Sequence, residues 1–204
     1  EHNLTIFHLM GQHVNYKQRY RLNQGKFWAS SYEDKRPELT NAQRKMLSHY
    51  DNATLYNDSI VAQIVKRFQK QNAIIIYVPD HGEECYEENR GFICRNHSAN
   101  IDWPLAHYEF EIPFWIYCSP KYIKNHRDIY RQIRKAKDKR FMTDALPHLL
   151  LYLAGIETPT YKEEYNILSP KYNEMRPRIL KNSVDYDKLR DEYYKKQEKK
   201  GAKK

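Results

Sequence analysis

One apolar run constrains the fold of this chain more than any other feature. Residues 73–78 read Ala-Ile-Ile-Ile-Tyr-Val, and Pro79 ends the run. A continuous apolar run that stops at a proline is typical of a strand buried on both faces of a parallel sheet. Ligands of α/β proteins gather at the carboxyl ends of such strands. The polar sequence Asp80-His81-Gly82-Glu83, which follows at once, is therefore the first candidate for a functional site.

The remaining sequence alternates strand-like and helix-like patterns. β-branched and apolar residues predict strands, and apolar residues at helical spacing predict helices. Strands are expected at residues 4–10 and 112–118, and helices at residues 40–68, 121–135 and 142–154. Gly155 follows the last helix and is suited to end it. This order predicts an α/β sandwich with a mostly parallel sheet flanked by helices.

The composition narrows the class of protein. The chain of 204 residues carries 35 Lys and Arg against 26 Asp and Glu, a net charge of +9. Basic residues are interleaved with acids, and no RNP, KH or zinc-finger signature occurs, so we expect no nucleic-acid partner. No apolar run approaches the roughly 18 residues of a membrane-spanning helix. Residues 185–204 have almost no apolar periodicity after Leu189, which predicts a basic, solvated and frayed tail with some helix.

Asp80 and His81 are the candidate metal ligands. A carboxylate oxygen and an imidazole nitrogen suit zinc, and manganese less specifically. Glu83 could orient a ligand histidine through a hydrogen bond. The structural alternative is that Asp80 caps a turn and His81 packs beneath it.

Three further histidines are candidates for the same site. His13 lies just beyond the expected first strand, and either His97 or His107 could complete a site with it. No Ser-based triad motif, dinucleotide motif or phosphate loop occurs, and no threonine has an evident activating partner. A nucleophile is therefore not identifiable within these residues.

The cysteines leave two alternatives open. Cys85 and Cys94 flank a polar loop and could form a disulfide in an oxidising compartment, or both could be free thiols. Three cysteines without a CxxC spacing indicate no structural zinc site.

Several motifs, in order along the chain, resemble the catalytic domain of bacterial phosphoethanolamine transferases, which belong to the alkaline phosphatase and sulfatase superfamily. The resemblance covers about residues 4–155, and residues 166–180 resemble the tails of the branch that acts on lipopolysaccharide core or lipid A. The motifs are His8-Leu9-Met10-Gly11-Gln12-His13, Tyr50-Asp51-Asn52, Tyr77-Val78-Pro79-Asp80-His81-Gly82-Glu83, Ile112-Pro113-Phe114-Trp115 and Asp144-Ala145-Leu146-Pro147. The chain departs from the family at Pro79, where a serine is usual, and at Val14-Asn15, where Gly-Pro is usual.

The resemblance implies a chemistry. Family members take phosphoethanolamine from phosphatidylethanolamine onto a threonine held against zinc, and pass it to lipid A or to a core sugar of lipopolysaccharide. The implied zinc ligands here are Asp80 and His81, together with a glutamate and the threonine. His13 and His97 are implied to contact the phosphoryl group, with His107 as the alternative to His97. The family works at the bacterial inner membrane with its catalytic domain on the periplasmic side, which favours the Cys85–Cys94 disulfide.

The resemblance also implies a partial domain. Residues 1–165 correspond to the C-terminal part of the catalytic domain, and residues 166–204 to a C-terminal extension. The nucleophile-bearing half and the membrane helices would precede this segment, so we expect the segment alone to be inactive. A sulfatase or phosphoglycerol transferase of the same superfamily, or a noncatalytic basic binding module, remains an alternative.

Overall fold

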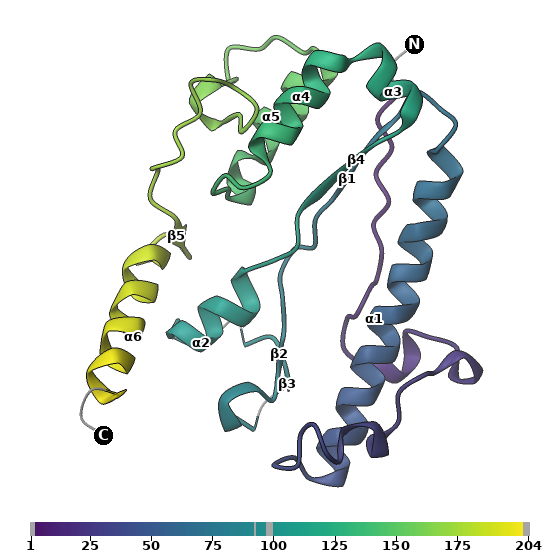
Figure 1. Cartoon of the computed structure of the whole chain (residues 1–204), viewed down its shortest axis with the longest axis vertical. Helices are drawn as coiled ribbons and strands as arrows, with labels where there is room; N and C mark the ends of the chain where they lie inside the picture. The colour runs from purple at the N-terminus through teal and green to yellow at the C-terminus, as the bar shows by residue number, and fades with distance from the viewer. Residues whose placement is uncertain (1–2, 92, 97–99, 202–204) are drawn as a thin grey trace.

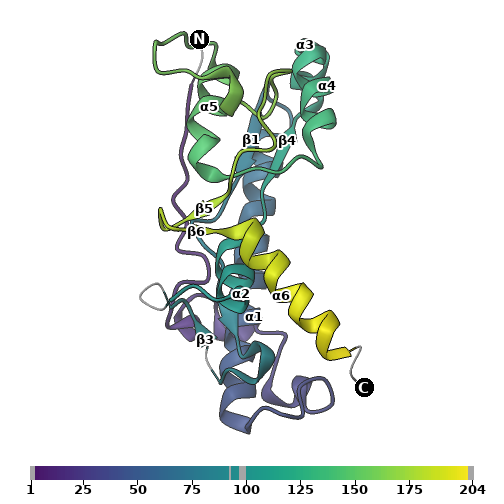
Figure 2. The ribbon, with the colours of Figure 1, turned by 90° about the vertical axis from the view of Figure 1, so that its left-hand side faces the viewer.

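The computed structural model describes residues 3–91, 93–96 and 100–201. Its helices and small sheets form a mixed α/β fold, drawn in Figures 1 and 2. The helices are α1 (Asn41–Phe68), α2 (Trp103–Leu105), α3 (Pro120–Asn125), α4 (Arg127–Ala136), α5 (Leu146–Ala154) and α6 (Tyr186–Gly201). The strands are β1 (Ile74–Tyr77), β2 (Glu84–Cys85), β3 (Ile93–Cys94), β4 (Trp115–Cys118), β5 (Ile179–Leu180) and β6 (Val184–Asp185). Within these described residues no helix is both long and apolar enough to cross a membrane.

Helix α1 begins and ends where its sequence predicts. Thr40 accepts a hydrogen bond from the Gln43 backbone N–H, and the Gln43 side chain accepts one from the Thr40 N–H at 2.8 Å. These reciprocal bonds satisfy two N–H groups that a helix N-terminus otherwise leaves unpaired. The predicted helix at residues 40–68 is therefore confirmed.

The apolar run forms strand β1 as predicted, but its pairing differs from the prediction. β1 pairs with β4 in the antiparallel direction, with Ile74 opposite Cys118 and Tyr77 opposite Trp115. The other two strand pairs in the described ranges are antiparallel as well. The α/β class is thus confirmed, while the mostly parallel pairing is wrong for these residues. β1 is also half-buried rather than fully buried.

The predicted first strand is wrong. Residues 3–10 form no strand, and four of their apolar side chains are exposed: Leu4, Ile6, Phe7 and Met10. An extended segment becomes a strand only where a neighbouring backbone accepts and donates its hydrogen bonds. The described residues place no such strand beside this segment.

The core behind β1 and β4 comes from the helical half of the chain. Ile76 and Ile116 pack against a cluster that includes Leu149 of α5 and Ala136 of α4. Gly155 ends α5 in the left-handed conformation, with φ +66°, as its position predicts. The expected helix at residues 121–135 is split into α3 and α4 at His126, whose φ is −130°.

Residues beyond 165 are integral to this fold. Ile167 and Leu168 are buried in the same cluster as Leu149. Further along, α6 lies beside α2 in both views (Figures 1 and 2), and Tyr186 packs against Trp103. Residues 186–201 form helix α6, so the fraying predicted for them is wrong, while the expected helix is present. Tyr186, Tyr193 and Leu189 of α6 pack in one cluster with Trp103.

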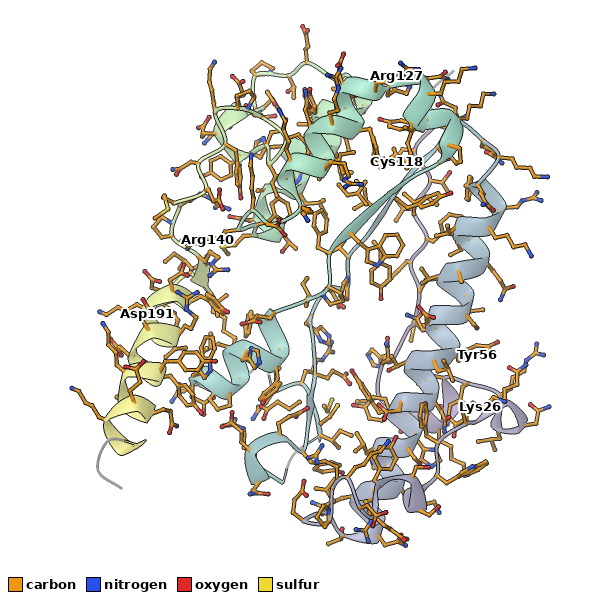
Figure 3. All side chains as sticks on the ribbon, viewed as in Figure 1. Lys26, Tyr56, Cys118, Arg127, Arg140 and Asp191 are labelled. Atoms are coloured by element: carbon orange, nitrogen blue, oxygen red, sulfur yellow. The ribbon has the colours of Figure 1, made fainter. Side chains whose placement is uncertain are left out.

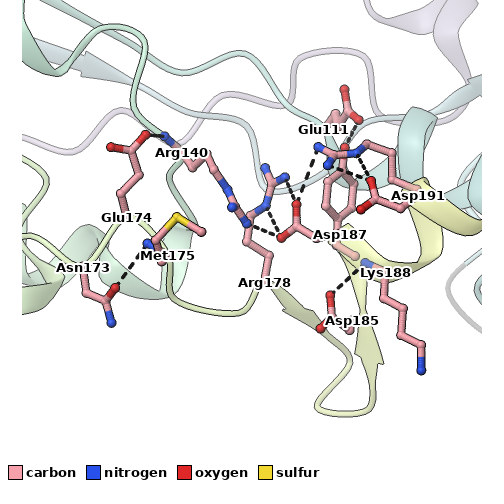
Figure 4. Close-up of polar contacts among 12 residues, drawn as sticks. Glu111, Arg140, Asn173, Glu174, Met175, Arg178, Asp185, Asp187, Lys188 and Asp191 are labelled. Carbon is pink, nitrogen blue, oxygen red and sulfur yellow. Dashed lines mark hydrogen bonds and ion pairs between the residues drawn. The ribbon is translucent and has the colours of Figure 1, made fainter.

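An ion-pair network holds the start of α6. Arg178 donates to both carboxylate oxygens of Asp187, at 2.5 and 3.1 Å, and Arg140 donates to one of them (Figure 4). Arg190 lies 3.6 Å from the same carboxylate. Figure 3 shows Arg140 and Asp191 on the α6 side of the molecule, opposite Lys26 and Tyr56. The hydrogen bond from Arg178 holds the pKa of Asp187 below its usual range.

We expect Asp187→Asn to loosen α6 by about 1 to 2 kcal/mol, since hydrogen bonds to a charged group are lost. Because the pKa of Asp187 is lowered in the folded state, this stabilisation is present above the ordinary value of about 3.9 and is lost as the pH falls through the lowered pKa. Amide hydrogen exchange of α6 at pH 6 measures the effect. The control is Asp191→Asn on the same helix, whose carboxylate is 56% exposed and forms an ion pair with Arg190. Equal exchange in both variants would contradict the prediction.

Candidate metal and phosphoryl site

The candidate site begins where β1 ends. Pro79 has no N–H to continue the ladder, and the next residue, Asp80, turns out into solvent with its side chain 86% exposed. The Asp80 carboxylate accepts a hydrogen bond from the His81 backbone N–H at 3.2 Å. The His81 side chain turns inward and is 19% exposed. The carboxylate therefore remains accessible while the imidazole is held.

The hydrogen bonds of His81 show which of its two ring nitrogens carries the proton. Nδ1 lies 2.7 Å from the Gly82 carbonyl oxygen, which can only accept, so Nδ1 carries the proton. The lone pair is then on Nε2, which lies 3.6 Å from the Asp80 carboxylate and accepts a hydrogen bond of 2.6 Å from Arg95. This is the tautomer in which an imidazole can bind a metal through Nε2.

Gly82 fixes the position of this loop. Its N–H donates to the Glu109 carbonyl at 2.8 Å, in the π-helical turn η5 (Ala106–Phe110). A Cβ atom at Gly82 would lie 2.2 Å from the Tyr108 carbonyl oxygen. Only glycine allows this approach, so the candidate ligands are tied to the η5 backbone.

Glu83 links the loop to the N-terminal segment. The buried hydroxyl of Tyr16 donates to the Glu83 carboxylate at 2.7 Å. Burial raises the pKa of Glu83 and is the largest effect on it, while the Tyr16 hydrogen bond acts in the opposite direction. The charge of Arg95, and those of His81 and His13 when these imidazoles are protonated, also lower the pKa of Glu83. His13 and His81 therefore both lie near this carboxylate.

The other predicted site residues have different surroundings. His13 is exposed, and its carbonyl accepts a hydrogen bond of 2.9 Å from Arg19. His107 stacks on Trp103 with ring centres 5.5 Å apart, and its Nδ1 lies 3.0 Å from Glu111. These contacts place it on the α6 side of the η5 turn. His97 lies outside the described residues.

The expected disulfide between Cys85 and Cys94 is wrong, because both residues are free thiols. In the β2–β3 hairpin, Cys94 lies opposite Glu84, and Cys85 lies opposite Ile93. The two cysteines are offset by one position in the register and do not face each other across the ladder.

Asp80 and His81 fit a zinc ion by their chemistry. They offer one carboxylate oxygen and one imidazole lone pair on adjacent residues, which is the donor type that zinc takes. No group of three or more His, Cys, Asp or Glu side chains that could hold a metal occurs in the described part of the chain. These two residues would therefore supply part of a ligand set.

Sequence reasoning missed Tyr16 and Arg95. Tyr16 contacts Glu83, which is 67 residues away along the chain, and Arg95 contacts His81, which is 14 residues away. Their positions gave a weak signal, since Tyr16 lies three residues after His13 and Arg95 two residues before His97.

A hollow of about 460 Å³ elsewhere in the molecule contains none of the predicted site residues. It is lined by Arg36, Glu38, Glu87, Glu88, Asn89 and Tyr108.

Comparisons with known proteins give these residues a context. The family model described as Sulfatase matches residues 1–156. The phosphoethanolamine transferase EptC of Escherichia coli strain K12 is 34% identical over 194 residues, which cover 91% of this chain and 32% of that protein. The Kdo(2)-lipid A phosphoethanolamine 7''-transferase of the same strain is 30% identical over 145 residues, which cover 67% of this chain and 23% of that protein.

A solved structure is similar as well. The crystal structure of the C-terminal periplasmic domain of EptC from Escherichia coli, in complex with Zn, superposes with a TM-score of 0.69 at 30% identity. The match covers 87% of this chain and 49% of that domain. This chain thus spans about a third of the length of the EptC relative and about half of the solved domain. Since the family model matches most of its residues, the chain belongs to the sulfatase family.

Proposed function

We propose that the protein carrying this chain transfers phosphoethanolamine from phosphatidylethanolamine to lipid A or to the lipopolysaccharide core. It would act at the bacterial inner membrane, with this domain on the periplasmic side and with membrane helices outside these residues. The observation that carries the proposal is the pairing of an accessible Asp80 carboxylate with a His81 lone pair at the end of β1. The relatives named as phosphoethanolamine transferases support the reaction class.

Asp80 and His81 would hold the zinc ion. When bound, the metal lowers the pKa of a coordinated hydroxyl nucleophile and neutralises charge on the transferring phosphoryl group. The Nδ1 proton of His81, donated to the Gly82 carbonyl, leaves the ring lone pair on Nε2, the atom that would bind the metal. Glu83, held by Tyr16, supplies negative charge beside the imidazole.

His13 and His97 would contact the phosphoryl group. His13 is exposed and close enough to Glu83 to act on its pKa, which supports a place at the substrate side of the loop. His107 is the weaker candidate, because its ring is stacked on Trp103. The nucleophile would be a threonine outside residues 1–204.

The test is transfer of label from a phosphatidylethanolamine analogue in the presence of zinc and lipid A. The full-length protein is expected to label one of its threonines outside residues 1–204 first, and lipid A afterwards. The 204-residue chain alone is expected to transfer nothing, because it offers only two of the four expected zinc ligands. Stoichiometric label on a threonine within residues 1–204 would contradict the proposal. Cleavage of an aryl sulfate by a full-length protein that transfers no phosphoethanolamine would identify a sulfatase instead.

A further inference from the structure

The guanidinium of Arg95 lies against the candidate metal ligand. Arg95 follows strand β3, where Cys94 has a φ of +108° and turns the chain. From there Nη1 of Arg95 donates to Nε2 of His81 at 2.6 Å. The positive charge of Arg95 also lowers the pKa of Glu83, so its guanidinium lies near that carboxylate as well as against His81.

This contact uses the atom that a metal would need. Nε2 carries the one lone pair of the His81 ring, since Nδ1 is protonated and bonded to the Gly82 carbonyl. A guanidinium remains charged at every physiological pH. Arg95 and a metal cation therefore exclude each other at Nε2, both by occupancy and by repulsion between like charges.

Displaced from Nε2, the guanidinium needs another acceptor nearby. One Glu83 oxygen already accepts the Tyr16 hydroxyl. The planar fork of an arginine matches the oxygens of a phosphoryl group, which it can bind with two parallel hydrogen bonds. A side chain within one hydrogen bond of a metal ligand is also close to where the reacting group would sit.

We propose that Arg95 is a catalytic residue with two positions. Before metal binding it occupies Nε2 of His81, and after metal binding it donates to the phosphoryl oxygens of the group being transferred. The first position makes Arg95 a competitor of the metal, and the second makes it a stabiliser of the transition state. Only the second position of Arg95, its contact with the phosphoryl oxygens, rests on the proposed function.

The experiment compares Arg95→Gln with wild type in the full-length protein. Zinc affinity, measured by competition with a chromogenic chelator, is expected to become about tenfold tighter, because a charge-assisted hydrogen bond no longer competes. The kcat of phosphoethanolamine transfer is expected to fall by about a hundredfold, the typical loss for one donor to a developing oxyanion. Arg131→Gln is the control. It removes the same charge from an arginine that is 72% exposed and paired with Asp128, and both quantities should stay at the wild-type value.

Each outcome decides one part of the proposal. Unchanged or weaker zinc affinity in Arg95→Gln overturns the competition at Nε2. Tighter zinc with an unchanged kcat overturns the phosphoryl contact. If wild-type protein transfers no phosphoethanolamine while Arg95→Gln still binds zinc more tightly, the proposed function fails and the competition stands. A thermal unfolding midpoint checks folding. If Arg95→Gln does not fold, Arg95→Lys keeps the charge without the fork, and is expected to retain the zinc affinity while losing kcat.

Discussion

Asp80→Ala in the full-length protein is expected to lower phosphoethanolamine transfer by about a thousandfold. The substitution removes the carboxylate that lies 3.6 Å from Nε2 of His81, and with it one of the two proposed zinc ligands. Zinc content per protein should fall together with the rate, because in the proposed reaction the metal would both activate the nucleophile and neutralise the phosphoryl charge. His81→Ala should give the same paired loss.

Asp138→Ala is the matched control for this substitution. The Asp138 carboxylate is 85% exposed, nearly the same as the 86% of Asp80, and its ion pair with Lys137 is a solvent-exposed contact. It should leave both the rate and the zinc content unchanged. Wild-type transfer by Asp80→Ala, measured with the same labelled donor, would exclude Asp80 as a ligand and with it the proposed site.

Elements that depend on local patterns could be predicted from the sequence. The helical spacing of apolar residues from residue 40 onward placed α1, and the apolar run ending at Pro79 placed β1. Gly155 ended α5 for a local reason, its positive φ. Each of these elements is determined by residues within a few positions of one another.

Features that depend on distant neighbours were predicted less well. An apolar run indicates burial but does not say which strand lies beside it, and β1 pairs in the antiparallel direction with residues 115–118. The same limit explains residues 3–10, whose apolar pattern is that of a strand although no strand of the described residues pairs with them. The tail after residue 185 is held as a helix by aromatic and ionic contacts with residues far away in the sequence, such as Trp103 and Arg140.

The residues of the candidate site also fall into those that local sequence predicted and those that it did not. Asp80 and His81 stood out because they follow β1 directly, whereas Arg95 and Tyr16 reach the site only through the fold. The cysteine pair was misjudged because a loop that two cysteines flank does not reveal the register between its strands. Glu84, and not Cys85, lies opposite Cys94, so the two cysteines are one position out of register.

Gly82→Ala is expected to disrupt both the fold of the site and its activity. The added Cβ would lie 2.2 Å from the Tyr108 carbonyl oxygen, a backbone atom that cannot rotate away. The loop or the η5 turn must then shift, and the hydrogen bond from Gly82 N–H to the Glu109 carbonyl is strained with it. We expect the free energy of unfolding to fall by about 3 kcal/mol or more, the upper range for overpacking. Because Asp80 and His81 immediately precede this residue, zinc affinity should fall too.

Gly91→Ala separates this collision from the general cost of replacing glycine. Gly91 has a φ of +67° and no atom within 4 Å of an added Cβ, whereas the φ of Gly82 lies outside the left-handed region. Its replacement should cost only about 1 kcal/mol, the strain of a left-handed alanine, and should leave zinc affinity unchanged. Urea unfolding and chelator competition on both variants of the full-length protein measure the difference. If Gly82→Ala were no more destabilising than Gly91→Ala, the close approach between Gly82 and the Tyr108 carbonyl would not exist in the protein. The placement of His81 that the proposed chemistry needs would then depend on other contacts, among them the hydrogen bond from its Nδ1 to the Gly82 carbonyl.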